Sequence, residues 1–117
     1  MNNKKNKVWI LGPCALESRE MFLQTAEAIN NIMTESDEWY MKASFDKANR
    51  TSLHGARGIG MEASKEIWLE ARQSFPNMKF ITDVHETNQV EKLVGCVDVV
   101  QIPAFLCRQT DLIVECA

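Results

Sequence analysis

Hydrophobic and polar positions along the chain switch between two periods, and the switch occurs four times. Apolar residues in short runs or at every second position predict strands, whereas a 3.6-residue spacing predicts helices. The predicted strands cover residues 8–11, 38–44, 79–84 and 97–102. The predicted helices cover about residues 19–34, 61–75 and 87–94, and a fourth begins at residue 109 and is cut off at residue 117. A strand followed by a helix, repeated in this way, predicts parallel strands joined by right-handed crossovers.

The same patterns predict which side chains face the core. In the first helix these are Met21, Phe22, Thr25, Ala26, Ile29 and Met33, with Ser18 as the N-cap. In the second helix they are Ser64, Ile67, Trp68, Ala71 and Phe75. In the strand 38–44 one face holds Trp39, Met41 and Ala43, and the other holds Tyr40, Lys42 and Ser44. Lys42 is therefore expected near the C-terminal end of a strand, on one side of the sheet.

Polar residues that are able to do chemistry follow the predicted strands rather than the helices. Cys14 follows the first strand, which Gly12 and Pro13 end, and a basic segment follows the second. His85 follows the third strand and Arg108 the fourth. Ligand sites of parallel α/β proteins lie at the C-terminal ends of the strands, so this placement favours a binding function.

The basic segment, residues 42–60, reads KASFDKANRTSLHGARGIG. It holds four cationic side chains against one acid, in a chain whose formal net charge is −3: Lys42, Lys47, Arg50 and Arg57 against Asp46. Lysine supplies a point charge and arginine a planar fork, which together suit phosphates and carboxylates. Neutral donors suited to sugar hydroxyls come from Asn49, Thr51 and Ser52. The alternative, which composition alone favours, is a solvated basic loop, and the position between a strand and a helix counts against it.

Composition narrows the functional classes. A chain of 117 residues with 45% hydrophobic and 25% charged residues is that of one ordinary globular domain. An acidic balance argues against nucleic acid as a partner. The apolar run VWIL is too short for a signal peptide or a membrane span, so a cytoplasmic location is expected.

Single residues leave several chemistries open. The four cysteines, at positions 14, 96, 107 and 116, form no CxxC pair, and three of them are expected to be packing residues. For Cys14 taken alone, three roles are open: a metal ligand, a nucleophile or a simple packing residue. The packing residue is favoured. His85 beside Asp83 is a ligand, a proton carrier or an ordinary hydrogen-bonded histidine. Gln101, an amide on an otherwise apolar strand, needs a polar partner.

Four segments together resemble a known family. GPCALES at residues 12–18, KASFDKANRTS at 42–52, ITDVHE at 81–86 and VDVVQIPAFLCRQTDL at 97–112 are similar to 3-deoxy-D-manno-octulosonate-8-phosphate synthase. The similarity extends over residues 8–117. The sister family, 3-deoxy-D-arabino-heptulosonate-7-phosphate synthase, typically has KPRTSP in the loop, whereas here Ala48 and Asn49 precede Arg50. This difference favours the octulosonate family.

The resemblance implies a (β/α)8 barrel, usually a cytoplasmic homotetramer, that condenses phosphoenolpyruvate with D-arabinose 5-phosphate and releases phosphate, a step toward lipopolysaccharide. Carried over by position, Lys42, Lys47 and Asp83 are implied catalytic residues. The residues implied to lie by phosphoenolpyruvate are Lys42, Lys47, Gln101 and Ala104, and those implied to hold the sugar phosphate are Asn49, Arg50, Thr51 and Ser52. Cys14 matches the metal ligand of the metal-dependent branch, and its divalent metal is zinc, iron or manganese.

The family's chain is more than twice as long. Residues 1–117 therefore correspond to the N-terminal half, with about the first four β/α units of the barrel. The family's other metal ligands, and a further lysine and arginine, come from the second half. We expect this chain to carry part of an active site and to be inactive alone. The alternatives are an enzyme of the heptulosonate type and a non-catalytic remnant.

Overall fold

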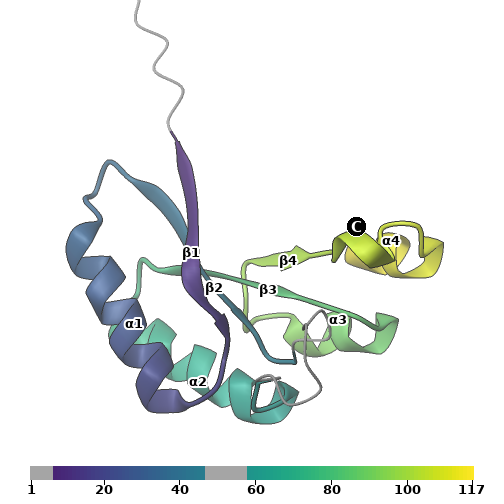
Figure 1. Cartoon of the computed structure of the whole chain (residues 1–117), viewed down its shortest axis with the longest axis horizontal. Coiled ribbons are helices and arrows are strands. Elements are labelled where there is room, and N and C mark those ends of the chain that lie inside the picture. Colours follow the sequence, from purple (N-terminus) through teal and green to yellow (C-terminus); the bar gives the residue numbers. More distant parts are fainter. Residues whose placement is uncertain (1–6, 47–57) are drawn as a thin grey trace, which may run out of the picture.

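Four parallel strands and the helices between them form the predicted arrangement in a computed structural model, which describes residues 7–46 and 58–117 (Figure 1). The elements are β1 (Val8–Ala15), α1 (Arg19–Ile32), β2 (Glu38–Ser44), α2 (Met61–Ser74), β3 (Lys79–Asp83), α3 (Thr87–Leu93), β4 (Val99–Gln101), the 3₁₀ turn η1 (Ala104–Leu106) and α4 (Thr110–Cys116). The sheet order is β1-β2-β3-β4, and every neighbouring pair is parallel. Sequential parallel order with one crossover helix per strand is the arrangement of the first units of a (β/α)8 barrel. The predicted fold class is confirmed.

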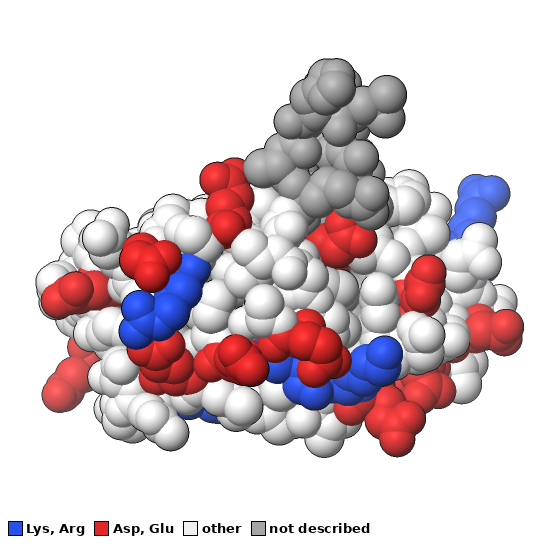
Figure 2. Space-filling model, turned by 90° about the horizontal axis from the view of Figure 1, so that it is seen from below, with Lys and Arg blue, Asp and Glu red and all other residues white. Residues whose placement is uncertain are grey.

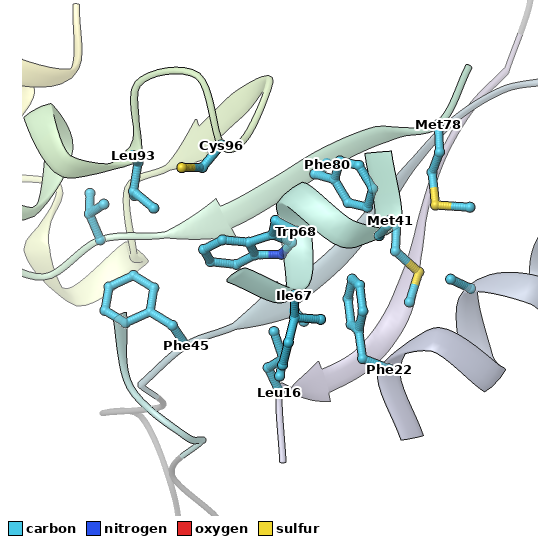
Figure 3. Packing of buried hydrophobic residues seen from close by; sticks show 14 of the residues in the cluster. Leu16, Phe22, Met41, Phe45, Ile67, Trp68, Met78, Phe80, Leu93 and Cys96 are labelled. Atoms are coloured by element: carbon cyan, nitrogen blue, oxygen red, sulfur yellow. The ribbon is translucent and has the colours of Figure 1, made fainter. Parts of the chain in front are cut away.

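The core fills one side of this sheet. Its fully buried side chains come from both long helices and from the two central strands, and Figure 3 shows them converging: Phe22, Met41, Trp68 and Phe80. Phe22 and Phe80 have ring centroids 6.3 Å apart, and Phe45 meets Trp68 edge-on at 6.4 Å. The expected core stripe is confirmed in α2. In α1 Phe22 and Ala26 are buried and Ile29 packs against the core, whereas the other predicted positions, Met21, Thr25 and Met33, are only half-buried. Burial of these large side chains is the main stabilising contribution.

Helix ends follow local hydrogen bonding. The Ser18 hydroxyl accepts a hydrogen bond from the Met21 amide at 3.1 Å, which confirms the predicted N-cap. The first three helices end one or two residues earlier than predicted, within the usual uncertainty of a helix end. Gly95 has φ +81° just after α3, where a left-handed residue is easiest for glycine.

β1 is longer than predicted. We expected Gly12 and Pro13 to end it, but the strand continues to Ala15 across a break in register between Leu11 and Cys14. A bulge accommodates the extra residues without ending the ladder. Gly12 is required here, because a Cβ at this position would overlap the carbonyl oxygen of Lys42 on β2.

β4 is shorter than predicted. The amides of Cys96 and Val97 both donate to the Leu93 carbonyl, at 2.9 and 3.3 Å, and so they belong to the turn after α3. The Asp98 amide donates to the Phe80 carbonyl at 2.8 Å, and its carboxylate accepts from the Phe80 amide at 2.7 Å. The expected strand 97–102 is therefore reduced to three residues. The turn η1 after it was not predicted.

Ion pairs join the outer elements. Arg19 on α1 contacts the Glu70 carboxylate on α2 through two nitrogens, and Arg72 on α2 donates to Asp98 at 2.9 Å. The face seen from the helix side carries intermixed cationic and acidic side chains, with acids in the majority (Figure 2). Within the described ranges, no helix has the length and apolar character needed to cross a membrane.

Candidate active site at the C-terminal ends of the strands

Strand register brings three of the predicted site residues together. Lys42 on β2 pairs with Ile81 on β3, and Asp83 on β3 pairs with Gln101 on β4. Residues that pair in register point to the same side of a sheet, and so do residues two apart on one strand. Lys42, Asp83 and Gln101 therefore share one side, toward the C-terminal ends of three adjacent strands.

That side is opposite the core. The alternate residues Met41 and Ala43 are fully buried against the helices, whereas Lys42 is only partly buried. We call the side that holds Tyr40, Lys42, Ile81, Asp83, Val99 and Gln101 the open face, because of these six residues Ile81 is buried and the other five are partly or fully exposed. A cation, a carboxylate and an amide thus lie on one surface, next to the edge where β/α enzymes bind their ligands.

Asp83 and His85 form a pair at the end of β3. His85 Nε2 lies 3.3 Å from Asp83 Oδ2, and each side chain is only 13% exposed. The other polar atom of each residue, Asp83 Oδ1 and His85 Nδ1, is buried and has no hydrogen-bond partner within residues 7–46 and 58–117. Of the three roles that the sequence left open for His85, the geometry favours a histidine whose ring is held against the Asp83 carboxylate.

The turn that carries His85 is held by a residue that the sequence analysis did not identify. Gln89 Oε1 accepts from the amides of His85 and Glu86, at 2.8 and 3.1 Å. The Val84 amide also donates to the Gln101 carbonyl at 3.2 Å, which ties the turn to β4. Gln89 is the N3 residue of α3 and completes a capping box, but Glu86 is not one of the usual N-cap residues, so the sequence carried only part of the usual signal.

Two aromatic rings fix the imidazole. Phe45, which is 2% exposed, meets His85 edge-on with centroids 6.3 Å apart, and Phe105 from η1 lies at 6.4 Å with a 31° angle between the rings. Phe45 follows β2 and Phe105 follows β4, so three neighbouring strand ends meet at His85. Neither phenylalanine was identified from the sequence, because an apolar residue after a strand is usual in any core.

Cys14 lies at the C-terminal end of β1 with a left-handed backbone, φ 70°, and is exposed. A positive φ is uncommon for a residue other than glycine and is often found at functional sites. Across residues 7–46 and 58–117, no three His, Cys, Asp or Glu side chains are grouped so that they could hold a metal ion. An exposed thiol at a strand end has the chemistry of one soft metal ligand, and the described residues group no further ligands with it.

The other cysteines differ from the expectation in one case. Cys96 is buried and Cys116 is partly buried, as packing residues should be, and burial raises the pKa of the Cys116 thiol. Cys107 is exposed, so its predicted role in packing is wrong. It lies at the end of the short turn η1, none of whose three residues is buried.

The basic segment falls largely outside the described residues. The predicted ligands Lys47, Asn49, Arg50, Thr51 and Ser52 all lie there, so their roles stay predictions. Its flanks are described: the Gly60 amide donates to the Phe45 carbonyl at 2.9 Å, and the Ile59 amide donates to the Leu16 carbonyl at 3.0 Å. Both ends of the segment are thus attached beside the C-terminal ends of β1 and β2. Ala104, also a predicted ligand, is exposed and begins η1 just after β4.

Two clefts lie at opposite ends of the strands. One of about 430 Å³ is lined by Phe45, Asp46, residues 58–61 and Gln89, at the C-terminal end of β2. A larger one of about 570 Å³ lies where β2 and β3 begin, and its lining includes Glu35, Glu38 and Lys79. The larger cleft is at the end of the strands away from Asp83 and Gln101. Cleft size alone would therefore place a ligand site at the N-terminal ends of the strands, whereas the predicted site residues lie at the C-terminal ends.

Comparisons with known proteins agree with the geometry. A family model described as "DAHP synthetase I family" matches residues 1–117. The chain is 50% identical over 111 residues to the 2-dehydro-3-deoxyphosphooctonate aldolase of Wolinella succinogenes, and this covers 94% of the chain and 42% of that protein. It is 46% identical over 114 residues to the protein of the same name from Campylobacter jejuni (strain RM1221), covering 97% and 42%, and 50% identical over 107 residues to that from Helicobacter hepaticus, covering 91% and 39%.

These relatives carry another name of the octulosonate enzyme, so the resemblance found in the sequence is confirmed and the heptulosonate alternative is not favoured. The chain spans about 42% of the length of the relatives from Wolinella and Campylobacter.

Proposed function

Because the chain belongs to the DAHP synthetase I family, we propose that it forms the N-terminal four β/α units of a 2-dehydro-3-deoxyphosphooctonate aldolase. The proposed reaction joins carbon 3 of phosphoenolpyruvate to the aldehyde of D-arabinose 5-phosphate, while water adds at carbon 2 and inorganic phosphate is released. The observation that supports it is the shared position of Lys42, Asp83 and Gln101 on the open face, at the C-terminal ends of the strands.

The charges of the proposed substrates explain the need for this arrangement. Both carry phosphate, and two anions repel each other unless cations hold them within bonding distance. Lys42 would contact phosphoenolpyruvate as a point charge at the end of β2, with Lys47 as its neighbour from the basic segment. Gln101 and Ala104 would lie by the same substrate.

The sugar phosphate needs a different set of groups. We assign its phosphate to Arg50 and to the hydroxyls of Thr51 and Ser52, with Asn49 beside them, because a guanidinium and hydroxyls match phosphate oxygens. Asp83 would line the same cavity on the β3 side. The described ends of the basic segment, at Phe45 and Gly60, support this because they attach the segment next to Lys42.

A metal completes the proposal. Cys14 would be one ligand of a divalent ion, zinc, iron or manganese, and a soft thiolate suits zinc or iron best. When bound, such an ion lowers the pKa of water or polarises an aldehyde. The other ligands would come from outside the described residues. The homotetramer and the cytoplasmic location implied by the resemblance stay predictions.

A chimera tests this function. Residues 7–117 replace the matching segment of the Wolinella succinogenes relative, and phosphate release is measured with phosphoenolpyruvate and either D-arabinose 5-phosphate or D-erythrose 4-phosphate. We expect release with the five-carbon sugar phosphate and at least tenfold less with the four-carbon one. Release that favours erythrose 4-phosphate would support the heptulosonate type. A folded chimera that releases no phosphate would support the non-catalytic remnant.

A further inference from the structure

β4 depends on contacts that lie outside its own ladder. It has only three residues, Val99–Gln101, and it lies beside β3 at the edge of the described sheet. So short a strand forms few ladder hydrogen bonds, and its register with β3 needs further support. Register matters for the candidate site, because a slip of one residue would turn Gln101 from the open face to the core face. A slip of two residues would displace Gln101 by about 6.6 Å along the strand.

Asp98 supplies two of the supporting contacts. Its amide donates to the Phe80 carbonyl at 2.8 Å, and its Oδ2 accepts from the Phe80 amide at 2.7 Å. In an ordinary parallel ladder a backbone carbonyl of the neighbouring strand would accept from that amide. Cys96 and Val97, which precede Asp98, belong to the turn after α3, so the Asp98 carboxylate takes the place of the backbone carbonyl.

Arg72 on α2 fixes the Asp98 carboxylate from the helix side. Its Nη2 donates to Asp98 Oδ2 at 2.9 Å, and its Nε donates to the Cys96 carbonyl at 3.3 Å. The guanidinium also lies 5.4 Å from the centroid of the Phe80 ring, which is completely buried. A planar fork can hold two acceptors at once, which a lysine cannot do in the same way. One side chain thus connects α2, the turn before β4 and the beginning of β3.

The pairing that begins at Asp98 leads directly to the candidate site. Three pairs follow along the two strands: Ile81 with Val99, Thr82 with Val100 and Asp83 with Gln101. At the far end the Val84 amide donates to the Gln101 carbonyl at 3.2 Å. The place of Gln101 beside Asp83 therefore follows from the register that is set three residues earlier.

We propose that Arg72 and Asp98 are positioning residues for the phosphoenolpyruvate side of the site: they set the register of β4 and thereby place Gln101 on the open face. Both lie on the helix side of the sheet, so they act without touching a substrate on the open face. The consequence for phosphoenolpyruvate rests on the proposed function, whereas the control of register does not.

Amide hydrogen exchange, measured by NMR on the chain itself, tests the control of register. The Val84 amide reports on the end of β4, and the Leu16 amide, which donates to the Ser44 carbonyl at 2.9 Å, reports on β1 and β2. In Asp98→Ala we expect exchange to accelerate at Val84 at least about tenfold more than at Leu16, because the opening is local. A purely structural role would accelerate both amides equally. Asp98→Asn keeps an acceptor for the Phe80 amide and should restore most of the protection.

Two arginine variants provide a matched comparison. Arg72→Met removes the guanidinium beside β4 and keeps the Asp98 contacts to Phe80, so the selective acceleration at Val84 should be smaller, about threefold. Arg19→Met is the control, because Arg19 also pairs with a carboxylate, that of Glu70, but lies on α1 toward the other edge of the sheet (Figure 1). It should change Val84 and Leu16 equally.

The consequence for the site is measured in the chimera. Asp98→Ala should raise KM for phosphoenolpyruvate about tenfold and KM for D-arabinose 5-phosphate less than twofold, since a small displacement of one contact weakens the substrate that it touches. Asp98→Asn should restore the first value, and Arg19→Met should change neither. A general loss of structure would instead reduce the amount of active enzyme and leave both KM values unchanged.

The outcomes separate this proposal from the proposed function. Equal acceleration at Val84 and Leu16, or none at Val84, would overturn the control of register. An active chimera whose KM for phosphoenolpyruvate is unchanged in Asp98→Ala would overturn the link to the substrate. Selective acceleration at Val84 together with an inactive chimera would support the control of register and contradict the proposed function. If Asp98→Ala does not fold, the comparison of Arg72→Met with Arg19→Met decides, and if the chain alone shows no protected amides, the two KM values decide.

Discussion

The two faces of the same sheet perform different tasks. On β2, Met41 and Ala43 are completely buried under α1 and α2, while Lys42 between them lies on the open face. On β3, Phe80 is completely buried, and Asp83 lies on the open face. Because side chains alternate along a strand, one stretch of sequence supplies both a core and a site. Substitutions on the two faces should therefore separate stability from binding.

The open face itself differs between its two ends. At the end where the strands begin, Lys79 pairs with Glu38 at 3.8 Å and lies over the Tyr40 ring at 5.3 Å, so the charge of Lys79 is already matched. At the C-terminal end, Asp83 Oδ1 and His85 Nδ1 are buried and have no hydrogen-bond partner among the described residues. Ser64 Oγ and Trp68 Nε1 in the core are likewise buried without a partner among the described residues, so a missing partner alone does not identify a ligand site.

The largest expected effect is on the covered face. Trp68→Ala removes a completely buried side chain that packs against Phe45, and it should lower the free energy of unfolding by about 3–5 kcal/mol. Urea unfolding followed by circular dichroism measures this. Leu69→Ala is the control, because Leu69, which follows Trp68 in the sequence, is 47% exposed. This substitution should lower the free energy of unfolding by no more than about 0.5 kcal/mol. Equal losses in the two variants would contradict the assignment of the core.

The next effect concerns the contact between β1 and β2. Gly12→Ala places a methyl group against the carbonyl of Lys42, and overpacking of this kind costs about 1–3 kcal/mol. Hydrogen exchange of the β1 and β2 amides should become faster. Gly95→Ala meets no neighbouring atom and strains only its own left-handed backbone, so exchange in β1 and β2 should stay unchanged there. Unchanged exchange in Gly12→Ala would show that β1 does not approach β2 as described.

Asp98→Ala tests how the start of β4 is held. Its carboxylate accepts from the Phe80 amide at 2.7 Å and from Arg72 at 2.9 Å, and loss of a partner for a partly buried amide costs about 1–3 kcal/mol. The expected value is at the lower end, because Asp98 is 34% exposed. The thermal unfolding midpoint measures the loss. Asp111→Ala, an exposed aspartate, should leave the midpoint unchanged, and a matching decrease would argue against this role.

The smallest effect is expected on the outer surface. A hydrogen bond from Arg19 lowers the pKa of Glu70, so this pair contributes stability above the ordinary glutamate pKa and loses it as the pH falls through the lowered value. Glu70→Gln should therefore reduce the difference in stability between neutral and acidic pH. The pair is exposed, so added salt should weaken the effect. If added salt does not change this pH-dependent difference in stability, the Arg19–Glu70 pair is not exposed to solvent as described.

The sequence predicted the covered face well and the open face only in part. Helix and strand periods identified Phe22, Trp68 and Met41 as core residues, because burial determines the period directly. The extent of β1 could not be predicted, since Gly12 and Pro13 usually end a strand and the bulge depends on the approach of β2. β4 is shorter than predicted because Asp98 is held by the Phe80 amide. These two residues are 18 positions apart in the sequence, so no local pattern predicts their contact.

The candidate site was predicted mostly through family resemblance. Periodicity placed Lys42 near a strand end, but only the register shows that Asp83 and Gln101 lie on the same face. The pairing of His85 with Asp83 was one of several alternatives, and its buried atoms without partners need coordinates to be seen. The Phe45 and Phe105 contacts to His85 come from three loops, and no local pattern predicts them.

The comparison of two lysines on the open face tests the central claim most directly. In the chimera, Lys42→Met removes the proposed contact to phosphoenolpyruvate, and Lys79→Met removes an equal charge from the opposite end of the same face. A lost charge-assisted hydrogen bond of about 1.5–3 kcal/mol should raise KM for phosphoenolpyruvate about 10–100-fold in Lys42→Met. Lys79→Met should leave that KM unchanged. Equal changes in both variants, or a larger change in Lys79→Met, would contradict the placement of the site at the C-terminal ends of the strands.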